Sequence, residues 1–271
     1  MKKLSTVLWL ILIVACRPSS DAPVDPINSA QEQAEAFAAA QVPINAPELT
    51  PIPFKSVDLT LEVPSQPGTA LNYRFQYDNQ QKLQTISAQT APIFQLETMG
   101  TTTVRQTLDQ LTGEYTLNAE GLGTQVNGVL PGGVPFVRNY LYRNGYLVSS
   151  YGSGSQLTTR HFSPEGDLLA WKGEAHNGQF VNAIYTYTTF PNTIRQEVFR
   201  WEAAHFAFRG DFLGRYSTHL VEQAQFRVAG QATHTLNFSY TFDEQGRVET
   251  MSIARTEGSA QLPNALYRFS Y

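Results

Sequence analysis

The chain has 271 residues and a formal net charge of −4, and 42% of its residues are hydrophobic against 15% charged. The length suffices for one large all-β domain or two small ones. The acidic balance argues against nucleic acid as a partner and against electrostatic adsorption to anionic lipid, because both depend on clustered Lys and Arg.

Residues 1–15 have the features of a secretory signal peptide. Two lysines near the start precede the unbroken apolar run Val7–Ala15, which is too short to span a bilayer. The segment Ile13–Cys16, with the letters IVAC, resembles the lipobox of bacterial lipoproteins. That resemblance implies cleavage before Cys16 and lipid modification of its thiol, and an ordinary signal peptide with an incidental cysteine is the alternative. Cleavage would remove two lysines and no acid, which changes the net charge from −4 to −6.

Cys16 is also the only cysteine of the chain, so no internal disulfide can form. Exported proteins often depend on disulfides. This fold must therefore depend on packing and strand pairing alone.

Residues 16–54 are expected to form an acidic tether. Seven of the 15 prolines lie there, and proline fixes φ and removes a backbone donor, so such a stretch stays extended. Within it, Ala30–Gln41 is a short helical candidate, with Ser29 and Glu32 as a capping box. The apolar side of this candidate is nearly all alanine. We therefore expect a transient helix in a flexible spacer rather than a docked element.

From residue 55 onward, apolar and polar residues alternate between turn signals, the pattern of half-buried strands. Residues 104–111 fit either a strand or a helical turn, and no long amphipathic helix is expected after residue 54. The expected elements are strands or hairpins over 71–86, 93–99, 101–107 and 114–117, a long loop or a pair of tight turns over 118–134, hairpins over 140–148 and 158–171, strands over 180–189, 194–201 and 205–208, an irregular or helical connector over 211–223, a strand over 225–228, a hairpin over 237–253 and a last strand over 267–271.

Three hairpins follow one seven-residue scheme. Tyr77–Leu83, Phe162–Leu168 and Phe242–Val248 align without gaps as an aromatic residue, a turn former, two turn residues, glycine, a polar residue and an aliphatic residue. The first copy has Gln81 in place of the glycine, and Tyr142–Leu147 is one residue shorter around Asn-Gly. The next inward residue follows at a spacing of three in each copy (Leu83/Ile86, Leu168/Trp171 and Val248/Met251). This spacing predicts a β-bulge early in the second strand.

The scheme resembles the tyrosine–aspartate (YD) repeats of large secreted shell proteins, and Phe242–Val248 is the nearest match. Together with the lipobox and the Pro-rich segment, the pattern resembles a group of Bacteroidetes outer-membrane lipoproteins of unknown function. The resemblance implies an antiparallel meander and a lipid anchor at Cys16 in the outer membrane. It carries over no catalytic residue.

The sequence thus predicts an all-β fold: a single antiparallel meander of ten or more strands that forms a strongly curved sheet or a partly open barrel. The expected organisation is a signal peptide over residues 1–15, a tether over 16–54 and one β-hairpin repeat domain over 55–271.

No arrangement of residues indicates catalysis or a cofactor. The five histidines (161, 176, 205, 219 and 234) are at least fourteen residues apart, so no local metal-ligand spacing exists. Asp211, Ser217 and His219 are close in sequence, but no G-x-S-x-G surrounds the serine, and a polar connector is the better interpretation. Gly121-Leu122-Gly123 lacks the third glycine of a dinucleotide fingerprint and is interpreted as loop glycine.

Other polar and aromatic residues have structural interpretations as well. The acidic pairs Asp243/Glu244 and Glu165/Asp167 could serve a glycosidase, but they lie in turns where such residues have local roles. Trp171 and Trp201 could form a stacking platform for a glycan or an apolar ligand, although core packing is favoured.

The sequence therefore favours a non-enzymatic, lipid-anchored envelope protein with a binding or structural role. The protein would attach to the membrane through a lipid on Cys16. A glycan, an apolar ligand or an envelope protein is a further candidate partner. A glycan-acting hydrolase with dispersed carboxylates and a carrier of an apolar ligand on a concave aromatic face are the alternatives.

Overall fold

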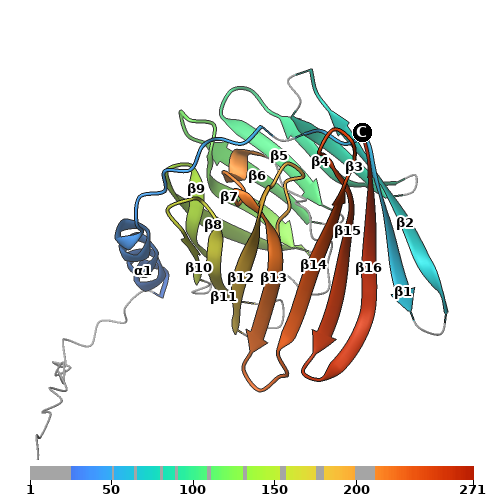
Figure 1. Ribbon diagram of the computed structural model, residues 1–271. Coiled ribbons are helices and arrows are strands. Elements are labelled where there is room, and N and C mark those ends of the chain that lie inside the picture. Colours follow the sequence, from blue (N-terminus) through green and yellow to red (C-terminus); the bar gives the residue numbers. More distant parts are fainter. Residues whose placement is uncertain are drawn as a thin grey trace, which may run out of the picture.

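The computed structural model describes residues 26–50, 52–63, 66–79, 82–88, 91–108, 111–130, 133–152, 157–174, 180–198 and 211–271. Its strands form one antiparallel meander that closes into a barrel, because β1 pairs with β16 as well as with β2 (Figure 1). The predicted all-β meander is confirmed, and the barrel is closed rather than partly open.

One α-helix and sixteen strands make up the regular structure of the described residues. Residues 104–111, which fitted either a strand or a helical turn, contribute to two strands, β5 and β6. The bounds are α1 Pro26–Ala40, β1 Ser56–Val63, β2 Gln66–Tyr77, β3 Leu83–Ala88, β4 Ala91–Thr98, β5 Thr103–Leu108, β6 Leu111–Leu117, β7 Gly123–Leu130, β8 Val134–Arg143, β9 Tyr146–Gly152, β10 Leu157–Phe162, β11 Leu168–Glu174, β12 Phe180–Pro191, the short 3-10 helix η1 Asp211–Leu213, β13 His219–Val228, β14 His234–Phe242, β15 Val248–Glu257 and β16 Ala260–Ser270.

The barrel is apolar inside and polar outside. Along β14, Leu236 and Phe238 are buried, whereas the alternating Asn237 and Ser239 are exposed. This alternation places one face of every such strand against the core and the other in solvent. Charged residues occupy exposed positions around the wall: Asp58 on β1, Arg74 on β2, Glu97 on β4, Glu114 on β6, Lys172 on β11, Glu222 and Arg227 on β13, Glu249 on β15 and Arg268 on β16.

The predicted bulge is present in all three copies of the hairpin scheme. Phe242 pairs with Val248 but Thr241 pairs with Thr250, so Glu249 is the extra residue. The same one-residue shift occurs after Leu83 and after Leu168. It restores the inward direction of the second strand, which is why apolar residues recur there at a spacing of three.

The sequence analysis missed one further copy, at Leu117–Gly123. It has the same bulge, the same closing hydrogen bond, from the amide of Asn118 to the carbonyl of Leu122 (2.8 Å), and a glycine with positive φ at Gly121 (78°). The expectation of a loop or tight turns over 118–134 was therefore wrong, because β7 runs through it. Its glycines and polar residues hid the strand, and Gly121-Leu122-Gly123 belongs to a hairpin turn.

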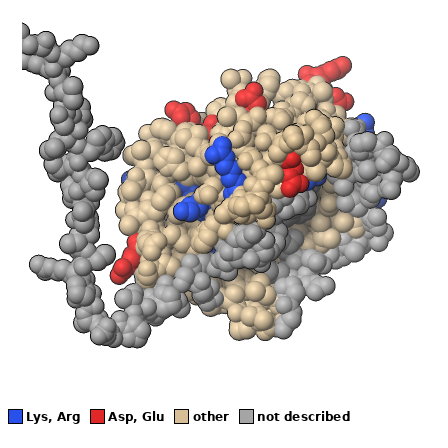
Figure 2. Space-filling model, turned by 90° about the horizontal axis from the view of Figure 1, so that it is seen from below, with Lys and Arg blue, Asp and Glu red and all other residues tan. Residues whose placement is uncertain are grey.

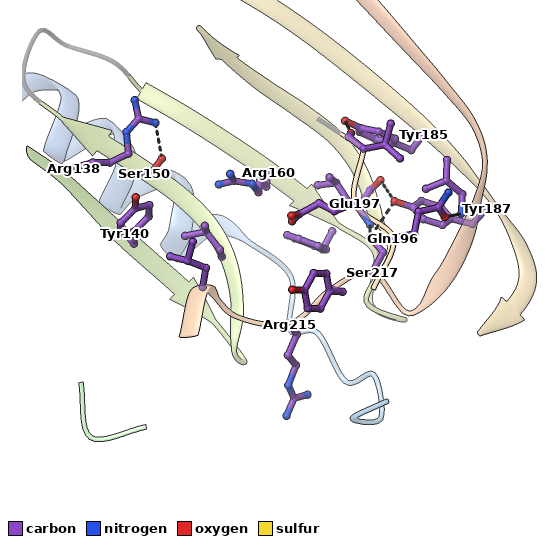
Figure 3. A pocket seen from close by; sticks show the side chains of 17 residues that line it. Arg138, Tyr140, Ser150, Arg160, Tyr185, Tyr187, Gln196, Glu197, Arg215 and Ser217 are labelled. Atoms are coloured by element: carbon purple, nitrogen blue, oxygen red, sulfur yellow. Dashed lines mark hydrogen bonds between the residues drawn. The ribbon is translucent and has the colours of Figure 1, made fainter. Parts of the chain in front are cut away.

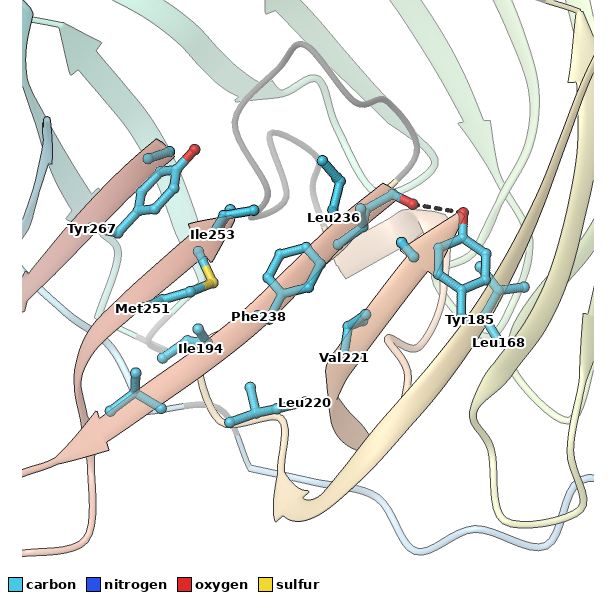
Figure 4. Packing of buried hydrophobic residues seen from close by; sticks show 14 of the residues in the cluster. Leu168, Tyr185, Ile194, Leu220, Val221, Leu236, Phe238, Met251, Ile253 and Tyr267 are labelled. Atoms are coloured by element: carbon cyan, nitrogen blue, oxygen red, sulfur yellow. Dashed lines mark hydrogen bonds between the residues drawn. The ribbon is translucent and has the colours of Figure 1, made fainter. Parts of the chain in front are cut away.

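The long connector between β12 and β13 enters the barrel. Residues 192–198, which we call the lumen segment, were expected to be part of a strand over 194–201. Instead they form no regular strand, and Ile194, Gln196 and Val198 are buried inside the barrel. Figure 4 shows Ile194 among the inward residues of the wall. Residues 205–208, also expected as a strand, lie outside the described residues.

Helix α1 is docked on the outside of the barrel, contrary to the expectation of a transient helix in a spacer. Ala30 and Ala34 are buried in a small cluster with Tyr151, and Leu141 and Leu157 pack against it. The helix lies along β8, β9 and β10. Its alanine face is therefore a close-packing surface, since small side chains let the helix approach the wall.

Residues 42–50 and 52–54, which we call the strap, run from α1 across one end of the barrel (Figure 1). Ile44 and Phe54 are buried in the main core. The backbone amide of Asn45 donates to the carbonyl of Pro164 (2.9 Å), and that of Ile52 donates to the carbonyl of Thr193 (2.9 Å). From Pro26 onward the expected tether is thus part of the folded body, and residues 16–25 lie outside the described residues.

Candidate functional site: a pocket at the strap end

The two ends of the barrel differ. The strap end carries the hairpin turns of the repeated scheme, the strap and both parts of the β12–β13 connector that the structure describes. The opposite end, which we call the far end, carries the turns β1–β2, β3–β4 and so on to β15–β16.

A pocket of about 870 Å3 opens at the strap end, and we call it the end pocket. Three parts of the chain form it: the strap, the wall from β3 to β9, and the connector after β12. Its lining residues are Pro47, Glu48 and Leu49 of the strap, Lys82, Leu83, Gln84, Leu96, Thr98, Gly100, Thr101, Val104, Leu117, Glu120, Gly121, Leu122, Gly145 and Tyr146 of the wall and its turns, and Asn192, Arg195, Asp211, Phe212, Gly214, Arg215, Tyr216, Ser217 and Thr218 of the connector.

The connector fixes the pocket floor through aromatic packing. Phe212 of η1 packs against Tyr115 of β6, with ring centroids 4.7 Å apart and the rings edge to face. Val104 and Val126 complete this buried cluster. Each such aromatic contact contributes on the order of 1 kcal/mol beyond its area burial. The floor is therefore a rigid apolar surface rather than an open channel.

Four of the charged groups that line the end pocket form two ion pairs. Asp211 accepts a hydrogen bond from the Arg195 guanidinium (3.1 Å), and Glu48 lies 3.7 Å from the Arg215 guanidinium. Arg215 also lies over the Tyr146 ring at 5.9 Å. The end pocket thus combines an apolar floor with an ionic rim, an arrangement suited to an amphipathic molecule.

A smaller cavity of about 200 Å3 lies deeper in the lumen, and Figure 3 shows its lining. Arg160 and Glu197 extend into it from different elements. Arg138 donates to the hydroxyls of Ser150 (3.4 Å) and Thr158 (3.5 Å). Arg215, Tyr216 and Ser217 line both this cavity and the end pocket, so the two spaces adjoin along the connector.

Burial governs the ionisation of the tyrosines around the inner cavity. Desolvation raises the pKa of Tyr187, and the hydrogen bond between its hydroxyl and Ser217 Oγ (3.1 Å) opposes this. Desolvation likewise raises the pKa of Tyr185 well above its usual value, and its hydroxyl donates to the Val198 carbonyl (2.7 Å). These hydroxyls stay protonated at neutral pH and act as fixed hydrogen-bond groups.

The structure separates the three residues that sequence proximity grouped as a triad. Asp211 pairs with Arg195. His219 Nδ1 instead lies 2.7 Å from a carboxylate oxygen of Asp167, whose other oxygen accepts the His219 backbone amide (2.8 Å). Ser217 Oγ accepts the backbone amide of Leu168 (3.2 Å). These contacts tie the connector to the β10–β11 turn.

The other residues singled out in the sequence lie elsewhere. Asp243 caps the β14–β15 turn by accepting the backbone amides of Gln245 and Arg247. Trp171 is half-buried against the core. His176, His205 and Trp201 lie outside the described residues. Within the described ranges, no group of three or more His, Cys, Asp or Glu is placed to hold a metal ion.

No helix in the described part of the chain is long and apolar enough to cross a membrane.

No family model matches the chain, and no curated protein matches it. The chain is similar in fold to a porin-like protein from Bacteroides uniformis. That match has a TM-score of 0.61 and 15% identity, and it covers 81% of this chain and 98% of the other. A porin-like protein from Bacteroides vulgatus also matches, with a TM-score of 0.49, 12% identity and coverages of 79% and 97%.

The B. uniformis match shows that the two proteins share an overall fold. In the described part of this barrel, the lumen segment and the cluster around Phe212 of η1 occupy part of the interior. Sequence reasoning missed both the end pocket and its floor. One signal was available: the β12–β13 connector, residues 192–218, is far longer than a hairpin turn, and a connection of that length commonly has a function.

Proposed function

We propose that this chain is a non-enzymatic, lipid-anchored protein of the cell envelope that binds a small amphipathic molecule in the end pocket. The observation that carries the binding function is the pocket itself. Its volume of about 870 Å3 lies within the roughly 300–1,000 Å3 of typical ligand sites. The rigid wall, the strap and the connector shape it from three sides.

The barrel itself stands in water, outside the lipid bilayer. A membrane-spanning barrel has an apolar band on its outer face and a polar lumen. Here charged residues such as Asp58, Glu114 and Arg268 are exposed on the outer wall, and Phe226, Phe238 and Tyr267 are buried within, although the inner cavity also holds charged side chains and the wall exposes single apolar ones. Attachment to the membrane then depends on the acyl chains expected at Cys16, and multiple chains anchor far more firmly than one.

Titration with 8-anilinonaphthalene-1-sulfonate, an amphipathic fluorescent probe, tests the binding function. Leu122→Trp is the variant of choice, because Leu122 lines the end pocket and a larger side chain there would occupy part of it and change its shape. We expect saturable binding by the unaltered protein and at least a tenfold weaker affinity for Leu122→Trp.

The matched control is Ile184→Trp, which adds the same side chain at an exposed position of the outer wall. We expect this variant to bind as the unaltered protein does. Equal affinity of the unaltered protein and Leu122→Trp, or no saturable binding at all, would contradict a ligand-binding role for the end pocket.

A further inference from the structure

The β7–β8 hairpin exposes a group of large apolar side chains at the far end of the barrel. Val129 is 47% exposed, Leu130 40%, Val134 56% and Val137 38%. They flank the turn on both strands, since Leu130 pairs with Val134 and Val129 pairs with Pro135. We call these four residues the apolar tip. The pairing places Leu130 and Val134 on one face of the hairpin and Val129 and Val137 on the other, so the hairpin end is apolar on both faces. Exposed apolar surface at the end of a hairpin is a candidate site of interaction.

The apolar tip lies within a long segment that has no charged residue. Residues 121–137 contain no Asp, Glu, Lys or Arg, whereas charged residues occupy exposed wall positions on most neighbouring strands. A charge-free apolar surface can enter the boundary between lipid headgroups and acyl chains at low cost, because no ion has to leave water.

The start of helix α1 lies toward the same end. After the helix, the amide of Ile44 donates to Asn144 Oδ1 (3.2 Å) in the β8–β9 turn, so the C-terminus of the helix lies at the strap end. Ala30, near the other terminus, belongs to the buried cluster that includes Tyr151, and Leu157 packs against this cluster. Tyr151 and Leu157 flank the β9–β10 connection at the far end. The chain that precedes Pro26 therefore leaves the body near the far end.

Only nine residues lie between Cys16 and Pro26, so ten Cα–Cα steps join the two. Fully extended, they reach at most about 35 Å. A lipid on Cys16 would thus lie within this reach of the start of helix α1, which is nearer to the far end than to the strap end. Figure 2 views the molecule from below: most of the described surface in this view belongs to uncharged residues, with Asp and Glu mostly near its edge and some Lys or Arg side chains near its middle.

We propose that the far end of the barrel faces the membrane and that the apolar tip of the β7–β8 hairpin inserts into the lipid surface as a second contact. This inference rests on the proposed lipid anchor. In this orientation the end pocket opens away from the membrane, and its ligand would enter from the aqueous side.

An environment-sensitive nitrobenzoxadiazole label tests this orientation in the full, lipid-modified protein bound to vesicles of phosphatidylethanolamine and phosphatidylglycerol. Cys16 would carry its lipid through sulfur, so Val134→Cys supplies the only free thiol. We expect the label at 134 to shift to shorter emission wavelength on vesicle binding and to be quenched by nitroxide-bearing lipid.

The matched control is Gln245→Cys, an exposed position in the β14–β15 turn at the strap end. Its label should keep the emission of a water-exposed probe. A label at 134 as exposed to water as the one at 245 would overturn the inference. A blue shift that needs no vesicles and grows with protein concentration would also overturn it, because a second copy of the chain would then cover the tip.

Flotation of the protein with the vesicles separates the two claims. Protein that does not float contradicts the lipid anchor, and the orientation falls with it. Protein that floats while its 134 label stays in water contradicts the orientation alone.

Discussion

The side-chain amide of Gln196, in the lumen segment, is hydrogen-bonded to the hydroxyl of Tyr240, on the barrel wall. Gln196 Nε2 donates to Tyr240 Oη at 2.7 Å, and that hydroxyl donates to the Val221 carbonyl at 2.6 Å. Gln196 Oε1 in turn accepts the Val221 amide at 2.8 Å. One buried amide therefore joins the lumen segment to two neighbouring strands, β13 and β14.

We predict that Gln196→Leu lowers the free energy of unfolding by about 3 kcal/mol, because two buried polar groups of the wall would lose a partner. Urea denaturation measures the change. Gln223→Leu is the control, since the amide of Gln223 donates to Asn237 on the exposed wall, and such surface changes alter stability by less than about 0.5 kcal/mol. Equal losses in both variants would show that the lumen segment does not stabilise the barrel.

Substitution by alanine should destabilise the protein to different extents at two glycines of the hairpin scheme. Both have positive φ, 88° at Gly166 and 75° at Gly246. A Cβ at Gly166 would meet Thr218 Oγ1 at 2.6 Å and Ala46 Cβ at 2.7 Å, whereas a Cβ at Gly246 meets nothing within 4 Å. We expect Gly246→Ala to lower the unfolding free energy by about 1 kcal/mol, the strain of the left-handed backbone alone, and Gly166→Ala to lower it by about 3 kcal/mol or more. Thermal unfolding distinguishes the two, and similar values would contradict the packing of the strap against this turn.

Docking of helix α1 is open to a paired test. Ala34 is fully buried against the barrel, and Ala36 is exposed. Ala34→Glu should release the helix, because it places a charge in an apolar contact. Limited proteolysis should then cut within residues 26–54 at least tenfold faster. Ala36→Glu should leave the cleavage rate unchanged, and fast cleavage of the unaltered protein would mean that the helix is not held.

Stability should fall at alkaline pH. Desolvation raises the pKa of Tyr77 to about 12 from its ordinary value of 10.0. The unfolded chain therefore loses this proton first, so the contribution is fully present below pH 10 and is lost as the pH rises toward 12. Desolvation also raises the pKa of Tyr271 to about 12, which adds in the same direction.

Urea midpoints at pH 9, 10 and 11 measure this loss. Tyr77→Phe removes one of the titrating hydroxyls, so this variant should lose less stability than the unaltered protein between pH 10 and 11. Stability that is constant over this range would contradict the burial of these tyrosines.

The sequence allowed the fold to be predicted well where side chains alternate regularly. The spacing of Val248 and Met251 predicted a bulge, and the bulge exists because turn and strand geometry are local properties. Whether the barrel closes depends on β1 meeting β16, a pairing between residues about 200 positions apart. No local pattern records such a contact.

The candidate site was harder to predict for the same reason. Phe212 and Arg215 looked like parts of an irregular connector, and only the closed barrel shows that the connector folds inward to form a pocket floor. Likewise, the prolines of the strap favoured an extended chain, and its described residues form no helix or strand. The contacts of Ile44 and Phe54 with the core depend on where the barrel end lies, which periodicity does not reveal.

We propose a barrel with an apolar core and a ligand pocket, whose outer wall stands in water and whose N-terminal lipid holds it near a membrane. Labelling of Ser239→Cys with a membrane-impermeant maleimide tests this most directly, because Ser239 is exposed in the middle of the outer wall on β14. In the lipid-modified protein bound to vesicles, we predict the same labelling rate before and after detergent is added. Protection that only detergent relieves would contradict the claim, since it would place the barrel wall within the bilayer.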